Sequence, residues 1–192
     1  MMTATAFNQT TPSSKPPKTV GWTEFKRNYL LREDRYKYEW VNGTVEKTLR
    51  SMDRTQIFIQ NNLLNFFYQL KATTGISGNL IAEGDTFFAG NHRRPDMAYY
   101  TDDQIETGRK DEEVSPAFVI GVISNQDQMN KVHAKMKDYR AANVQVIWHI
   151  FPKLEEVHVY HGKNMVVCLG DDICSAQPVI AGFQMAAKDV LK

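Results

Sequence analysis

The spacing of apolar residues along the chain predicts two long helices. In the first helix they recur at helical spacing, at Ile57, Leu63, Leu64, Phe67 and Leu70. This pattern stops before Gly75, and Ser51 or Asp53 is the predicted first residue. The second helix is predicted over residues 128–142, with Asp127 as its N-terminal cap.

Shorter apolar segments predict a sheet. Segments 36–41 and 44–49 are strand-like and are joined by Asn42-Gly43, a strong hairpin signal because both residues tolerate positive φ. Segment 117–123 is apolar throughout, as expected of a central strand that is covered on both faces. Further strands are predicted at 79–83, 86–89, 96–100, 145–151, 155–160, 164–169 and 180–183.

The remaining segments complete a mixed domain. A short helix is predicted over 24–31 with Thr23 as its cap, and another over 185–191. Residues 90–94 are predicted to form a polar turn and 102–113 a charged loop, with at most one helical turn. Strands mixed with two main helices predict one α/β domain, or more strictly a mixed α+β domain.

Composition narrows the class of protein. The chain has 192 residues, of which 42% are hydrophobic and 23% are charged, which suits one globular domain over 20–192. Residues 1–19 are rich in Thr, Ser and Pro and are predicted to form a disordered leader. The net charge of +1 means that any nucleic-acid surface must be a local patch. We expect a cytoplasmic protein with reduced thiols at Cys168 and Cys174, because no apolar run approaches the ~18 residues of a membrane span.

The sequence Arg93-Arg94-Pro95-Asp96 places a carboxylate at the start of a predicted strand. Pro95 favours extended geometry and removes one backbone donor, and ligands often collect at the ends of strands. A carboxylate at that position can hold Mg²⁺. The alternative, which the sequence leaves open, is that Asp96 caps a turn or pairs with Arg93 or Arg94.

Lys135 lies at the edge of the apolar stripe of the second long helix. A long side chain at this border can reach the end of the sheet, where it would steady a phosphate or activate water. Lys131, Lys137 and Arg140 share the helix, so an ordinary solvated face is the alternative interpretation.

The histidines give weaker signals. His92 next to Arg93 and Arg94 forms a basic cluster that is either a phosphate-binding site or a solvated turn. His149 lies inside an apolar strand, and His158 and His161 lack metal-ligand spacing, so core or surface roles are favoured for them.

The order of these motifs resembles a large family of putative restriction endonucleases that is abundant in cyanobacteria. The matching segments are Tyr38-Glu39-Trp40-Val41-Asn42-Gly43, Arg93-Arg94-Pro95-Asp96-Met97-Ala98, residues 115–127, residues 135–144, Trp148, Pro152 and Ile180-Ala181-Gly182-Phe183. The resemblance extends from about Trp22 to Leu191. It implies the PD-(D/E)XK nuclease fold, a mixed β-sheet flanked by helices and preceded by a helix and a hairpin. It also implies a DNA substrate, Mg²⁺ or Mn²⁺ as cofactor, and a homodimer.

The resemblance assigns catalytic positions to Asp96 and Lys135, with Asp96 also a metal ligand. The second metal-binding carboxylate of the family falls at Gly121, which has no side chain. Glu83 is the first candidate for a substitute ligand, because its strand is predicted to neighbour that of Asp96; Asp85 and Asp127 are further candidates. Arg93, Arg94 and Lys131 are expected to bind the phosphates of DNA.

Three functional hypotheses remain at this point. The first is a Mg²⁺-dependent DNA endonuclease that hydrolyses phosphodiester bonds with a relocated ligand or with impaired catalysis. The second is a catalytically inactive nuclease-fold protein that acts by binding DNA or a protein. The third is a small oligomeric binding or structural protein that uses the same fold without nucleic acid.

Overall fold

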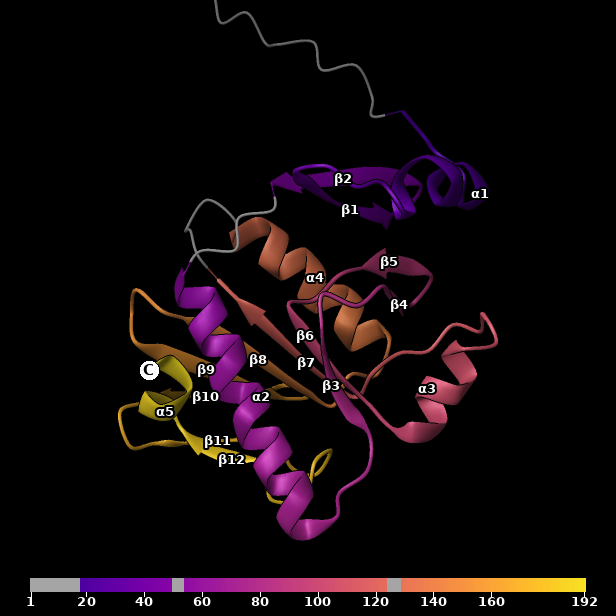
Figure 1. The fold of residues 1–192 in the computed structure, drawn as a ribbon. Helices are drawn as coiled ribbons and strands as arrows, with labels where there is room; N and C mark the ends of the chain where they lie inside the picture. Colours follow the sequence, from indigo (N-terminus) through magenta and orange to yellow (C-terminus); the bar gives the residue numbers. More distant parts are fainter. Residues whose placement is uncertain (1–17, 50–53, 124–128) are drawn as a thin grey trace, which may run out of the picture.

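The computed structural model describes residues 18–49, 54–123 and 129–192, and its centre is a mixed sheet of six strands (Figure 1). The strand order is β10-β9-β8-β7-β6-β3. These strands are β3 (Asn79–Ala82), β6 (Met97–Tyr100), β7 (Phe118–Val122), β8 (Val146–Phe151), β9 (Glu156–His161) and β10 (Asn164–Leu169). Only β7 and β8 are parallel among the neighbouring pairs of this sheet, because the helix α4 (Met129–Ala141) connects them in a crossover.

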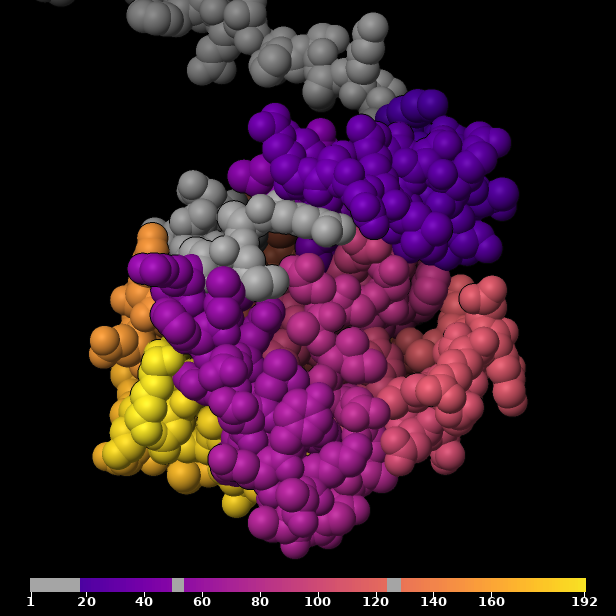
Figure 2. Space-filling view, in the orientation of Figure 1, coloured from indigo at the N-terminus to yellow at the C-terminus, as the bar shows by residue number. Residues whose placement is uncertain are grey.

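A second sheet carries the N-terminal hairpin against the end of the main sheet. Its order is β2-β1-β5-β4, with β1 (Tyr36–Val41), β2 (Thr44–Leu49), β4 (Thr86–Phe88) and β5 (Asn91–Arg93). Trp40 of β1 pairs with His92 of β5, which joins the hairpin to the chain segment between β3 and β6. Figure 2 shows the N-terminal segment (indigo) covering one end of the molecule. A small third sheet pairs β11 (Ile173–Ser175) with β12 (Gln184–Ala186).

Helices cover both faces of the main sheet. The long helix α2 (Arg54–Thr74) and the short helix α5 (Ala187–Leu191) contact each other and cover one face, and α4 lies on the other (Figure 1). Phe118 and Ile120 of β7 belong to the core beneath α2, whereas Val119 packs with Met136 and Tyr139 of α4. This alternation confirms the prediction that segment 117–123 is a central strand with two covered faces.

Several predicted boundaries change for physical reasons. Segment 90–94 was predicted to be a turn, but Asn91–Arg93 forms the strand β5 because it pairs with both β4 and β1. The first helix, α1 (Trp22–Phe25), has Gly21 rather than Thr23 as its N-cap, and it continues as the π-helical turn Lys26–Leu30. Residues 102–113 contain a complete helix, α3 (Asp102–Gly108), which begins with a capping box between Thr101 and Gln104.

The C-terminal prediction is wrong by a few residues. Segment 180–183 is not a strand; the strand is Gln184–Ala186, and its partner Ile173–Ser175 was not predicted. Cys168 and Cys174 are both free and buried. The predicted leader and the predicted helix starts at Ser51, Asp53 and Asp127 lie outside the described residues, apart from positions 18 and 19 of the leader. Across the described ranges, no helix combines the length and the apolar character that crossing a membrane would require.

Candidate functional site

Asp96 stands at the start of β6, in a cleft of ≈ 380 Å³ between the hairpin, β7 and α4. We call this cleft the carboxylate cleft; its charged lining residues are Lys37, Glu39, Glu46, Glu83, Arg94, Asp96, Lys131 and Lys135. Asp96 Oδ2 accepts a hydrogen bond from the Val122 backbone N–H at 2.7 Å, and Oδ1 lies 3.4 Å from Lys37 Nζ. The side chains of Lys37 and Asp96 are only 13% and 19% exposed. Both carboxylate oxygens of Asp96 therefore already have a donor from the protein.

Lys135 projects from α4 into the same cleft. Its Nζ donates a hydrogen bond to Glu39 Oε1 at 2.8 Å, between residues 96 positions apart in the chain. The structure thus brings Asp96 and Lys135 into one cleft, as predicted, but the ion pair of Lys135 is with Glu39 rather than with Asp96.

Glu39 is a buried carboxylate at which several donors converge. Besides Lys135, it accepts the backbone N–H of Arg94 at 2.8 Å and Nη1 of Arg93 at 3.2 Å. Burial alone would raise the pKa of Glu39, but the nearby Lys135 and Arg93 cations lower it to about 2. Glu39 is therefore ionised at neutral pH, as the fixed anion that orients Lys135.

Arg93 is buried behind this cleft, with 1% of its side chain exposed. Its guanidinium lies 3.2 Å from Glu39, 2.7 Å from Glu46 and 2.7 Å from Asp138 of α4. The prediction that Arg93 binds the phosphates of DNA does not fit this arrangement. Pairing of β5 with β1 carries the side chain inward, where three carboxylates surround it.

The other two predicted phosphate ligands lie nearer to solvent. Arg94 pairs with Asp85 and donates from Nη2 to the Leu30 carbonyl at 2.9 Å. Lys131 is exposed on α4 and lines the cleft, and its side chain has no ion pair with any residue that the structure describes. Of the three residues predicted to bind phosphate, Lys131 is therefore the most accessible.

Gly121 leaves room for a side chain. A Cβ atom at this position would lie 3.5 Å from His149 Cδ2 and 3.8 Å from Ile123 Cδ1, which are ordinary contacts. Glu83 follows β3, which pairs with β6, so the prediction that their strands are neighbours is confirmed. Glu83 also lines the cleft, whereas Asp85 is engaged by His92 and Arg94. The candidate Asp127 lies outside the described residues.

The donor set does not fit a metal site with two carboxylates. No group of three or more His, Cys, Asp or Glu side chains that could hold a metal ion occurs in the described ranges. Asp96 is engaged by Lys37 and Val122, Glu39 by three donors, and Glu46 by Arg93. Glu83 is the remaining carboxylate in the described lining of the cleft. Mg²⁺ requires oxygen ligands that replace part of its hydration shell, and Gly121, where the resemblance predicts a second carboxylate, has no side chain to supply one.

The chain matches the Uma2 family, described as "Putative restriction endonuclease", over residues 22–188. The chain belongs to this family. A crystal structure described as a putative nuclease from Anabaena variabilis has a similar fold, with a TM-score of 0.73 and 18% identity over 91% of this chain and 98% of that chain. The comparison with curated proteins gives no match. This member of the Uma2 family thus has the predicted mixed fold, with an N-terminal helix and hairpin.

Sequence reasoning missed four residues of this Uma2 site: Lys37, Glu39 and Glu46, which line the cleft, and Asp138, which pairs with Arg93. One signal was available for Glu39, which stands between Tyr38 and Trp40 in a strand. A glutamate is seldom fully buried unless it is paired, so a charged residue among large aromatic residues indicates a buried cation nearby. No comparable signal identified Lys37 or Asp138, whose partners come from distant segments.

Proposed function

We propose that this protein binds DNA at the carboxylate cleft and that its metal-dependent hydrolysis of phosphodiester bonds is impaired. Membership of the endonuclease family supports the DNA substrate. The observation that carries the impairment is the state of Asp96, whose oxygens are engaged by Lys37 and by the Val122 backbone N–H. The family resemblance supports it, because it places a second metal-binding carboxylate at Gly121, where this chain has no side chain.

Electrostatics gives the physical reason. In a site with two carboxylates, each anion offsets part of the hydration that a divalent cation loses on binding. In the carboxylate cleft these anions are balanced by protein cations instead, Asp96 by Lys37 and Glu39 by Lys135. A divalent cation would have to displace a lysine ammonium group, and it would then have one carboxylate ligand fewer than in a site with two carboxylates.

Binding of DNA is supported by the cations on the open side of the cleft. Lys131 is exposed on α4, and Lys135 is partly exposed despite its pair with Glu39. Because the net charge of the chain is only +1, these residues would act as a local patch. Arg93 would contribute indirectly, through its ion pair with Glu39.

Nicking of supercoiled plasmid with Mg²⁺ or Mn²⁺ tests the impairment. We expect the wild type to show no nicking above the buffer control. Gly121→Glu should nick at least roughly 100-fold faster than that control. The matched control is Gly121→Glu combined with Asp96→Asn, which should be inactive. Wild-type nicking that Asp96→Asn abolishes would overturn the proposal.

That outcome would favour a second candidate function, an active endonuclease with Glu83 as the relocated ligand. Its support is that Glu83 lines the cleft that contains Asp96. Loss of wild-type nicking in Glu83→Gln would establish this candidate, and unchanged nicking would exclude Glu83.

Retention of duplex DNA at increasing salt tests the binding. Each phosphate contact contributes about 0.9 to the slope of log K against log [salt], so Lys131→Gln should reduce this slope by roughly 1. No retention even at low salt would overturn DNA binding and favour the oligomeric structural protein. Sedimentation of the same samples measures the homodimer that we propose from the family resemblance.

A further inference from the structure

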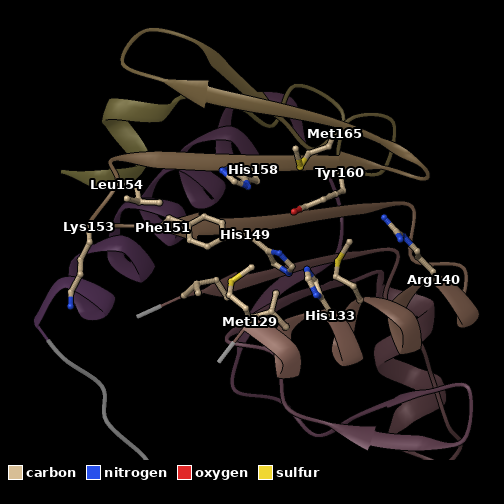
Figure 3. Close-up of a pocket in the computed structure, with 13 residues that line it drawn as sticks. Met129, His133, Arg140, His149, Phe151, Lys153, Leu154, His158, Tyr160 and Met165 are labelled. Carbon is tan, nitrogen blue, oxygen red and sulfur yellow. The ribbon is translucent and has the colours of Figure 1, made fainter. Parts of the chain in front are cut away.

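A second and larger pocket lies beside α4, over the face formed by β8 and β9 (Figure 3). We call it the histidine pocket; its polar and aromatic lining comes from His133 of α4, His149 and Phe151 of β8, and His158 and Tyr160 of β9. Its volume is ≈ 1190 Å³. Ile123, Val132 and His149 line both this pocket and the carboxylate cleft, so the two spaces adjoin.

The rings of the histidine pocket form two close pairs. The centroids of His149 and Tyr160 are 5.2 Å apart, and those of Phe151 and His158 are 4.5 Å apart. Residues two apart along a strand point to the same face, and His149 of β8 pairs with His158 of β9, so the four rings share one face of the sheet. Figure 3 shows these side chains directed toward the space beside α4. Aromatic side chains arranged along a groove are the surfaces on which the bases of single-stranded nucleic acids stack.

The charge of the pocket selects an anionic ligand. Arg140 and Lys153 contribute cations to the lining, and the part of that lining which the structure describes contains no aspartate or glutamate. Glu156, which is near in sequence, is paired with His158 at 2.8 Å. Phosphate groups complement such a lining. No other feature of the lining calls for an acidic protein as the partner.

His149 adds an unsatisfied polar group in the wall between the two spaces. It is 3% exposed, and its Nδ1 has no hydrogen-bond partner among the residues that the structure describes. Burial, together with the charges of His158, His133 and Lys135, lowers the pKa of His149 to about 4, so the ring is neutral at pH 7. A neutral imidazole offers one donor and one acceptor, and buried groups of this kind are normally satisfied.

We propose that the histidine pocket binds nucleotides of a single-stranded DNA segment adjoining the phosphodiester at the carboxylate cleft. This inference rests on the proposed function and narrows its substrate to DNA with a single-stranded region. The volume exceeds the roughly 300–1,000 Å³ of an ordinary small-molecule site, which suits more than one nucleotide.

The charge also argues against a second copy of the chain as the occupant. A two-fold contact places the same surface on both partners, so two linings that each carry the cations Arg140 and Lys153 would face each other. Because no carboxylate of the described lining is available to pair with them, such a contact would be repulsive.

Fluorescence anisotropy with labelled DNA of equal length, single-stranded or blunt duplex, tests the inference. We expect the wild type to bind the single strand about 10-fold more tightly than the duplex. Phe151→Leu, which keeps apolar volume but removes the ring, should abolish this preference and leave duplex binding unchanged. The matched control is Phe58→Leu, an exposed phenylalanine of α2 outside the pocket, which should change neither affinity.

A charge variant gives an independent readout. Arg140→Gln combined with Lys153→Gln should reduce the slope of log K against log [salt] for the single strand by about 1.4, since each contact to a single strand contributes about 0.7. An unchanged slope would overturn the assignment of these two cations to phosphate.

The failure of this inference can be distinguished from that of the proposed function. Duplex binding without a single-strand preference, or a preference that Phe151→Leu retains, would overturn the histidine pocket alone. Absence of binding to either DNA would overturn both. Sedimentation as a dimer that Phe151→Leu dissociates would also overturn the pocket assignment, because the surface would then be an interface between copies.

Discussion

The carboxylate cleft and the histidine pocket share His149 in their walls but differ in how their charges are satisfied. In the cleft, Glu39 and Asp96 are each held by a lysine of the protein. In the pocket, two cations line a space to which the described residues contribute no carboxylate. Charges that are satisfied internally fix a structure, whereas unsatisfied ones remain available to a ligand.

The two spaces are built by different elements of the fold. Ion pairs between β1, β5 and α4 hold the cleft in one arrangement, in which Lys135 cannot leave Glu39 without exposing a buried anion. The pocket depends mainly on the ring pairs of β8 and β9, in which only His158 has a carboxylate partner, Glu156, among the described residues. Substitutions in the cleft should therefore affect stability most, and those in the pocket should affect binding.

The largest effect is expected for Arg93→Met. This change leaves Glu39 and Asp138 buried with one cation fewer, and breaking a buried ion pair typically costs about 3–5 kcal/mol of unfolding free energy. Urea unfolding at pH 7 measures the loss. The control is Arg109→Met, whose pair with Glu106 is exposed and should contribute little. An equally small loss for both variants would show that the cleft is not held by its charges.

The next largest effect is a loss of unfolding free energy at acidic pH. The folded-state pKa of His149 is lowered from 6.5 to about 4, so the unfolded chain binds a proton more readily between these values. The stability that the neutral ring contributes is therefore fully present above pH 6.5 and is lost as the pH falls toward 4, by roughly 3 kcal/mol. Glu39, with its pKa lowered from 4.5 to about 2, begins to lose its contribution near pH 4.5, so it overlaps only the acidic end of this window.

Unfolding free energies of the wild type and His149→Gln, measured between pH 7 and pH 4, test this assignment. The variant should lose less stability on acidification, whereas the control His161→Gln should follow the wild type. Parallel curves for the wild type and His149→Gln would contradict a buried, neutral imidazole in the wall between the two spaces.

The sequence predicted most elements because their patterns are local. The predicted stripe lies on the core-facing side of α2 from Leu63 to Leu70, although its first member, Ile57, is exposed. The Asn42-Gly43 turn closes the β1–β2 hairpin. Both turn residues have positive φ, at 48° and 76°. In contrast, Asn91–Arg93 has no apolar alternation and is a strand only because β1 and β4 pair with it. No local pattern could have predicted that.

The same distinction applies to the site. Asp96 and Lys135 were candidates from their positions on a strand and a helix, the family resemblance assigned both to the site, and both line one cleft. Their ionic partners were not predictable, since Lys37 and Asp96 are 59 positions apart and Glu39 and Lys135 are 96 apart. Arg93 was misassigned to DNA for the same reason: the convergence of three carboxylates on it is a tertiary property.

A smaller effect on stability is expected for Lys135→Gln. Glu39 loses its strongest partner in this variant but retains Arg93 and the Arg94 backbone N–H, and Lys135 is already 28% exposed. We expect a loss of about 1–2 kcal/mol in urea unfolding, well below that of Arg93→Met. A double-mutant cycle with Glu39→Gln isolates the pair, and a coupling energy near zero would contradict the ion pair.

The smallest effect on stability, about 1 kcal/mol or less, is expected for Lys37→Gln, because the ion pair with Asp96 is long, at 3.4 Å, and Asp96 keeps the hydrogen bond from the Val122 backbone N–H. The more informative effect of this variant is on metal binding. In the Gly121→Glu background, Lys37→Gln frees Asp96 Oδ1 and removes a competing cation, so Mn²⁺ should bind roughly fivefold more tightly in calorimetry. Lys47→Gln removes the same charge from the hairpin, where the ammonium lies over the Tyr36 ring. An equal gain in both variants would mean that Lys37 acts only through overall charge, and the cleft would then differ from an ordinary metal site only at Gly121.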